Sequence, residues 1–225
     1  IFPPYPDRND VDLHAILHPA KEVGGDLYDF YMDDNHLYFL IGDVSGKGVP
    51  ASLFMAITRS LFRTLSQHVL SPAKIVTEMN NSISDNNESN MFVTLIVGIL
   101  DLETGILKLC NAGHNPPILI YPDGQVSYLE FKTQIFVGVV EDFKYSDEEV
   151  VLEKESKLFL YTDGVTEAEN INKELYGEEK LLEMLSDNAS SDVRTTVNVV
   201  VDSIASHVKE AEASDDLTIL LIQYE

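Results

Sequence analysis

The sequence lacks the features that would place it in several common protein classes. It contains one cysteine, Cys110, and no tryptophan among 225 residues. A single thiol excludes a disulfide framework within the chain and a zinc site built from cysteines, and it favours a reducing compartment. The apolar runs, such as residues 37–41 and 91–100, are far shorter than the ~20 residues of a membrane span. We therefore expect a globular domain that makes no membrane contact.

Basic residues are also scarce. The chain has 15 Lys and Arg against 38 Asp and Glu, which gives a formal net charge of −23. Such a surface repels the phosphate backbone of DNA and RNA, so we expect no nucleic-acid partner. Hydrophobic residues make up 44% and charged residues 24%, the composition of an ordinary globular protein.

Length and composition predict one domain. A chain of 225 residues can bury a substantial core, and no composition shift divides it. Three of residues 3–6 are proline, which prevents a helix, and the first residue is Ile1 rather than Met. We interpret residues 1–10 as the remnant of a linker from a missing upstream region, and residues 11–225 as the domain.

Short apolar segments predict many strands. Turn signals such as Pro122-Asp123-Gly124 join several of them, so their pairing should be mostly antiparallel. The predicted strands cover residues 11–18, 27–32, 36–41, 91–100, 106–110, 117–121, 125–130, 149–152, 157–161 and 217–223.

Four helices are predicted, in two groups. They begin near Pro50 and Ser71, and extend over residues 178–186 and 192–209. The first should bury an apolar face that recurs every four residues, at Leu53, Ile57, Leu61 and Leu65. Because strands and helices do not alternate, the fold class should be α+β, with helix pairs covering a stacked antiparallel core.

The glycine-rich stretch Gly42-Asp43-Val44-Ser45-Gly46-Lys47-Gly48-Val49-Pro50-Ala51 precedes the first predicted helix. It is not a P-loop, because only three residues separate the first two glycines and no Ser or Thr follows the lysine. A dinucleotide-binding fingerprint here would lack both the acid expected about 20 residues later and a βαβ frame. Cysteine-phosphatase chemistry is also excluded, because Pro116 stands where an arginine should follow Cys110.

Aspartates stand at the ends of four predicted strands, next to glycine or another aspartate. They are Asp26, Asp43, Asp163 and the pair Asp215-Asp216. If these strand ends meet, the carboxylates cannot all ionise at pH 7 without cations, and ligation by oxygen alone selects Mg²⁺, Mn²⁺ or Ca²⁺. The alternative is that each is a solvated turn residue, since aspartate is common in turns. Spacing alone leaves both interpretations open.

Five motifs in order resemble those of one phosphatase family. They are Pro19-Ala20-Lys21-Glu22-Val23-Gly24-Gly25-Asp26-Leu27-Tyr28-Asp29, the glycine-rich stretch above, Asn111-Ala112-Gly113-His114-Asn115-Pro116-Pro117, Tyr161-Thr162-Asp163-Gly164-Val165-Thr166-Glu167-Ala168 and Asp215-Asp216-Leu217-Thr218. Together they resemble the SpoIIE/RsbU-like branch of the PPM serine/threonine phosphatases, relatives of protein phosphatase 2C. The resemblance covers nearly the whole chain from about residue 12, and it implies a four-layer α-β-β-α sandwich.

The resemblance also implies a metal centre with two divalent cations, Mn²⁺ or Mg²⁺. Asp43 would bridge them, and the main-chain carbonyl of Val44 would bind one. Asp163 and Asp215 would hold the other, and Asp26 would belong to the outer part of the cluster. Asp215 rather than Asp216 matches the metal-binding acid of the family, although a shift of one residue remains an alternative.

Two further residues have open interpretations. His114 is a candidate general acid for the leaving serine oxygen, because imidazole titrates near neutral pH. Alternatively, it orders the loop that ends at Pro116-Pro117. Lys21 is a candidate contact for the substrate phosphate, or else a solvated surface charge.

The function implied by the resemblance is hydrolysis of phosphoserine or phosphothreonine on a regulatory protein, typically a STAS-type anti-anti-sigma factor. A hydroxide bridging the two metals would attack the phosphorus. An upstream sensor or dimerisation domain would act through the first helix, and the location would be cytoplasmic, with a membrane anchor allowed elsewhere in the full-length protein. The alternatives are a catalytically degenerate module that binds phosphoproteins and an acidic calcium-binding domain.

Overall fold

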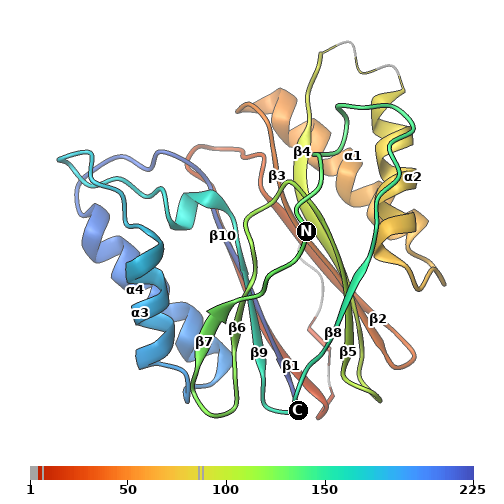
Figure 1. The fold of residues 1–225 in the computed structure, drawn as a ribbon. Coiled ribbons are helices and arrows are strands. Elements are labelled where there is room, and N and C mark those ends of the chain that lie inside the picture. Colours follow the sequence, from red (N-terminus) through yellow and green to blue (C-terminus); the bar gives the residue numbers. More distant parts are fainter. Residues whose placement is uncertain (1–4, 7, 86, 88) are drawn as a thin grey trace.

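The computed structural model describes residues 5, 6, 8–85, 87 and 89–225. Figure 1 shows two β-sheets face to face, with one helix pair outside each sheet. The predicted α+β class and the four-layer α-β-β-α arrangement are confirmed. No helix in this described part is long and apolar enough to cross a membrane.

One sheet has the strand order β1-β10-β9-β6-β7, and all its named pairings are antiparallel. At one edge of this sheet, β1 lies along the whole of β10, which joins the two ends of the domain. The strands are β1 (Val11–His18), β6 (Ile118–Ile120), β7 (Val126–Tyr128), β9 (Lys157–Tyr161) and β10 (Leu217–Tyr224).

The other sheet has the order β2-β3-β4-β5-β8 and is also antiparallel throughout its named pairings. The Asp33-Asp34-Asn35-His36 turn joins its first two strands, with Asp34 in the left-handed region at φ 49°. The strands are β2 (Leu27–Asp33), β3 (His36–Val44), β4 (Val93–Asp101), β5 (Ile106–Ala112) and β8 (Glu148–Val151).

The helices start where local signals favour a helix N-terminus. Pro50 lies in the first turn of α1 (Val49–Leu65), where a missing N–H costs nothing. The Ser71 side chain caps α2 (Pro72–Ser84), and the Asp192 side chain caps α4 (Val193–Val208). The remaining helix is α3 (Glu178–Asp187), and a short 3₁₀ turn covers Asp163–Val165.

Three apolar clusters hold the layers together. The central one fills the space between the two sheets and includes Phe39, Leu109 and Leu220. A second lies between α1, α2 and the β2–β3–β4–β5 face, and a third lies between α3, α4 and the β9–β10 face. The alternation along strands explains this layering, because successive side chains point to opposite faces of a sheet.

The predicted buried face of the first helix is wrong in its N-terminal half. Leu53 is 62% exposed and Ile57 is 55% exposed, whereas Thr58 and Phe62 are fully buried. A repeat of exactly four residues drifts around a helix that has 3.6 residues per turn, so the four predicted positions do not share one face. Only its C-terminal part, Leu61 and Leu65, packs against the core.

One strand boundary near the proposed site was predicted too early. The strand expected at residues 36–41 continues to Val44, so Asp43 lies within β3 rather than after it. Residues 1–4 and 7 of the predicted linker lie outside the described residues. Tyr5 lies against the domain, where its hydroxyl group donates a hydrogen bond to the carbonyl oxygen of Ala15 at 3.3 Å.

Candidate metal centre

The aspartates lie where strand ends from the two sheets meet. Asp26 immediately precedes β2, and its carboxylate accepts hydrogen bonds from the hydroxyl groups of Thr162 (2.7 Å) and Thr218 (2.6 Å). These threonines belong to the other sheet, at the end of β9 and the start of β10. Asp26 therefore ties the two sheets together at the edge where Asp43, Asp163 and Asp215 are found.

The acids influence one another electrostatically. Burial, followed by the charges of Asp26 and Asp163, raises the pKa of Asp43 well above its usual range, and Asp215 adds to the effect. Burial is also the main reason that the pKa of Asp26 is raised, while the two threonine hydroxyl groups oppose the shift. Carboxylates so arranged repel one another at neutral pH unless cations neutralise them.

Gly25 leaves room for the two ligands predicted in β3. A Cβ atom on Gly25 would lie 2.8 Å from the carbonyl oxygen of Val44 and 3.4 Å from Oδ1 of Asp43. Any larger residue would therefore push against the carbonyl group. The space beside Gly25 is thus lined by a carbonyl and a carboxylate oxygen, the donor types that Mg²⁺ and Mn²⁺ prefer.

The two adjacent acids before β10 have different roles. The Asp216 carboxylate accepts hydrogen bonds from the backbone N–H groups of Ala20 (2.8 Å) and Gly25 (2.8 Å). A Cβ atom on Gly24 would lie only 1.8 Å from this carboxylate, which explains the glycine at position 24. Asp216 therefore shapes the loop before β2, whereas Asp215 is half exposed and stays the candidate ligand.

The carboxylate and carbonyl oxygens suit divalent cations, but in this structure they are not close enough together to coordinate one. In the part of the chain that the structure describes, no group of three or more His, Cys, Asp or Glu side chains is already arranged to hold a metal. A cavity of about 20 Å³, room for one water-sized occupant, is bounded by Gly25, Asp43 and Asp215. Metal binding at this cavity requires the side chains to converge further.

His114 is buried and does not line this cavity. Its Nδ1 lies 3.0 Å from the hydroxyl oxygen of Thr94, which also lies 3.4 Å from the carbonyl oxygen of Asp43. Burial lowers the pKa of His114 to about 4, so its ring is neutral at pH 7. The Asn111 side chain bonds to the backbone N–H and C=O of His114. These contacts favour the loop-ordering interpretation over the general acid.

The two lysines near the cavity differ. Lys21, the predicted phosphate contact, is exposed and lines the cavity. Lys47 also lines it, and its ammonium group donates a hydrogen bond to Oδ2 of Asp215 at 2.9 Å. Sequence reasoning did not single out Lys47, although its place between two glycines in the metal-binding motif was a signal.

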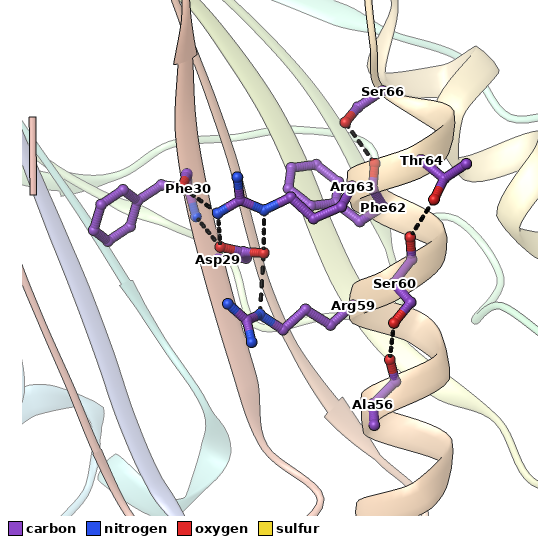
Figure 2. A network of polar contacts seen from close by, with 9 residues as sticks. All are labelled: Asp29, Phe30, Ala56, Arg59, Ser60, Phe62, Arg63, Thr64 and Ser66. Carbon is purple, nitrogen blue, oxygen red and sulfur yellow. Dashed lines mark hydrogen bonds and ion pairs between the residues drawn. The ribbon is translucent and has the colours of Figure 1, made fainter. Parts of the chain in front are cut away.

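A second network near the site was also missed. Figure 2 shows Arg59 and Arg63 of α1 reaching the fully buried carboxylate of Asp29 in β2. The Nε atoms of the two arginines lie 3.0 and 2.6 Å from Oδ2 of Asp29, and Arg63 also donates to the carbonyl oxygen of Phe30 at 2.8 Å. We call Asp29, Arg59 and Arg63 the Asp29 clamp. Two arginines four residues apart on a helix were a signal for a shared acid.

Comparisons with known proteins agree with this fold. The chain is 27% identical over 219 residues to the phosphoserine phosphatase RsbU of Bacillus subtilis (strain 168); the match covers 97% of this chain and 64% of that protein. The SiaA-PP2C domain of Pseudomonas aeruginosa has a TM-score of 0.85 at 22% identity, covering 95% of this chain and 86% of that chain. RsbX in complex with magnesium has a TM-score of 0.74 at 19% identity, covering 99% of each chain.

The family model described as Stage II sporulation protein E (SpoIIE) matches residues 33–225. This span includes Asp43, Val44, Asp163 and Asp215, and it begins after Asp26. The sandwich of two antiparallel sheets, the oxygen-lined cavity at their common edge and this match lead to one conclusion: the chain belongs to the SpoIIE family.

Proposed function

We propose that this domain is a metal-dependent protein phosphatase that hydrolyses phosphoserine or phosphothreonine on a regulatory protein. The observation that carries the proposal is the grouping of Asp26, Asp163 and Asp215 around Asp43, whose pKa is raised by burial and by their charges, with the Val44 carbonyl group beside Asp43. The name of RsbU, a phosphoserine phosphatase, supports the same reaction class. Because the chain spans less than two thirds of RsbU, the activity is proposed for this domain and not transferred from the whole protein.

The acidic side chains of the site would hold the divalent cations. Asp43 and the Val44 carbonyl would hold one divalent cation, and Asp163 and Asp215 a second, with Asp43 shared between them. Asp26 would belong to the outer part of the cluster, where its charge acts on Asp43. Mn²⁺ or Mg²⁺ bound there would lower the pKa of a water molecule that attacks phosphorus and would neutralise the phosphoryl oxygens.

The only thiol cannot provide a covalent alternative. Cys110 is fully buried in β5, and burial raises its pKa far above neutrality. A thiolate nucleophile needs access and a depressed pKa, and Cys110 has neither. Direct attack by water is therefore the route that these residues support.

The resemblance to the SpoIIE/RsbU-like phosphatases supports a proposal for the substrate and the controller. We infer a phosphorylated STAS-domain anti-anti-sigma factor as partner and an upstream sensor or dimerisation domain as controller. A cytoplasmic location stays a prediction.

The experiment is a phosphate-release assay on a phosphoserine peptide and on proteins captured from a lysate, with Mn²⁺, Mg²⁺ or EDTA. We expect release with either metal and none in EDTA. Binding of phosphoproteins without release would favour the degenerate module, and tight Ca²⁺ binding without Mn²⁺-dependent turnover would favour the calcium-binding domain. Full release in EDTA would contradict the metal-dependent reaction.

A further inference from the structure

One ion pair joins two loops that carry proposed metal ligands. Nζ of Lys47 donates to Oδ2 of Asp215 at 2.9 Å and to the carbonyl oxygen of Ser214 at 2.7 Å. Oδ1 of Asp215 accepts the backbone N–H of Asp216 at 3.0 Å. Both oxygens of the Asp215 carboxylate therefore already have a donor, and a metal ion that binds Asp215 must take at least one of them.

The Lys47 ammonium group acts on the other acids as well. The hydrogen bond to Asp215 is the main reason that the pKa of Lys47 is raised, and the charges of Asp216 and Asp43 contribute. Burial, Glu167 and Asp215 raise the pKa of Asp163, whereas Lys47 acts in the opposite direction. Lys47 is thus a positive charge among the carboxylates that are proposed to hold cations.

A divalent cation and this ammonium group cannot share Asp215 without cost. Two like charges that contact the same carboxylate repel each other, so binding of one disfavours the other. Lys47 lines the small cavity beside Asp215, so an ion that enters this cavity lies next to the ammonium group. Metal binding should therefore displace the Lys47 side chain.

The loop that carries Lys47 permits this displacement. Its neighbours Gly46 and Gly48 have φ angles of 90° and 77°, and a Cβ atom on either would meet nothing within 4 Å. The side chain of Lys47 is 52% exposed. The Lys47 side chain can therefore leave Asp215 without disturbing packed side chains. It still belongs to the loop that follows Asp43, so it stays near the site.

We propose that Lys47 is an internal cation that neutralises Asp215 when metal is absent, yields this carboxylate to the divalent cation, and then binds the phosphate group of the substrate. An ammonium group freed beside the site is a suitable point charge for a phosphate dianion. The proposal rests on the proposed function, since it assumes that Asp215 binds metal and that a phosphate group is the substrate.

The first test is Mn²⁺ binding measured by isothermal titration calorimetry, which needs no turnover. We expect Lys47→Gln to bind Mn²⁺ about 3- to 5-fold more tightly than the unaltered protein, the upper range for loss of an exposed ion pair. Lys21→Gln is the matched control: it removes the same charge from the same cavity without removing an ion pair to Asp215, and its affinity should change less than 2-fold. Lys47→Arg keeps the cation and should also stay within 2-fold.

Unchanged or weaker Mn²⁺ affinity in Lys47→Gln would contradict the proposal that Lys47 competes with the cation for Asp215. An equal gain in Mn²⁺ affinity in Lys21→Gln would contradict it as well. Thermal unfolding in EDTA checks that each variant folds. If Lys47→Gln does not, Lys47→Met, which keeps most of the side-chain length, takes its place.

The second test measures inorganic phosphate binding to the Mg²⁺-loaded protein, and KM for a phosphoserine peptide. Lys47→Gln should weaken phosphate binding and raise KM by about 10-fold, with a smaller effect on kcat, as expected for loss of one charge-assisted contact. Unchanged phosphate affinity would overturn the second half of the proposal. If the unaltered protein releases no phosphate with any metal, the proposed function fails, yet the Mn²⁺ titrations still decide whether Lys47 competes for Asp215.

Discussion

Helix α1 is attached to its sheet by different interactions from those of the pair α3 and α4. In the pair α3 and α4, apolar side chains form a continuous buried contact, at Leu181, Leu185, Val193, Val197, Val200 and Ile204. In contrast, α1 buries only Ala51 and Phe62 among its apolar residues and relies on the Asp29 clamp, as Figure 2 shows. Its outer side exposes Val49, Leu53 and Ile57.

This difference coincides with the position of the proposed metal centre. Helix α1 begins at Val49, directly after the Lys47 loop, and the clamp holds it to Asp29, three residues after Asp26. Helix α3 begins at Glu178, well beyond Asp163. The pair α3 and α4 thus stabilises the sandwich. The pair α1 and α2 does so too, and α1 is also coupled to the site through directional polar contacts.

The largest expected difference in turnover is between two Asp→Asn variants, one in the proposed metal centre and one at the start of α4. Asp43→Asn removes a charge from the proposed ligands and should lower turnover at least ~100-fold if the metals stabilise the transition state. Asp192→Asn, at the N-terminus of α4, should leave turnover unchanged, because asparagine also caps helices well. Phosphate release and circular dichroism measure both. Turnover of Asp43→Asn within a few-fold of the unaltered protein would remove Asp43 from the metal centre.

A second contrast separates stability from metal binding. Asp29→Ala leaves two arginines without their buried partner and should lower the free energy of unfolding by about 2–4 kcal/mol. Leu185→Ala in α3 should cost a similar amount, through the cavity it creates. Urea unfolding gives both values.

Mn²⁺ titration then distinguishes the two variants at temperatures where each is folded. Only Asp29→Ala should also weaken Mn²⁺ binding, since the clamp positions the helix that follows the metal loop. Equal Mn²⁺ affinities in the two variants would show that the first helix pair is no more coupled to the site than the second.

The third contrast concerns pH in the absence of metal. The carboxyl groups of Asp26 and Asp43 have raised pKa values, mainly because they are buried. They bind protons more strongly in the folded protein than in the unfolded chain, so stability should fall as the pH rises above about 4, the ordinary carboxyl value. Between pH 5 and pH 8 in EDTA, Tm should decrease by at least about 2–4 °C more than in Asp43→Asn.

Asp123→Asn, in the exposed turn between β6 and β7, provides the control for this measurement. It should keep the full pH dependence of the unaltered protein, because Asp123 lies away from the acid cluster. Saturating Mn²⁺ should reduce the fall in Tm. A pH dependence that is identical in Asp43→Asn would mean that these acids are not mutually repelling in the folded state.

The smallest expected effect is control through the N-terminus. Because α1 follows the metal loop directly and exposes an apolar face, an upstream element that shifts α1 should change the site. A parallel coiled coil fused before Ile1 in several registers should change turnover or Mn²⁺ affinity by more than 2-fold in at least one register. The same coiled coil fused after Glu225 should not. No effect in any N-terminal register would contradict control through α1.

Much of the fold was predictable because it depends on local patterns. The alternation in β1, the turn residues before Gly124 and the prolines and caps at helix starts each act over a few residues. The pattern failed for Leu53 and Ile57, because a spacing of four fixes neither the width of a helix face nor which part of it the sheet will cover. That coverage depends on how far β2 and β3 extend beneath the helix.

In the candidate site, too, some features depend on local sequence and others on tertiary packing. Residue types and order left metal ligands and solvated turn residues as open interpretations of the aspartates, and only their places at strand ends could be identified. The different roles of Asp215 and Asp216 could not, because they depend on which backbone N–H groups of the loop at residues 20–25 come within 2.8 Å of one carboxylate.

The strands, the helix starts and the order of the family motifs could be predicted from the sequence, because alternation, turn residues and short motifs act over a few residues. The pairing of Lys47 with Asp215 and the sharing of Asp29 by Arg59 and Arg63 depend on the tertiary structure. Lys47 and Asp215 are 168 residues apart, and Arg63 and Asp29 are 34 apart. Contacts over such separations arise when the layers of the fold pack on one another, and no local pattern specifies them.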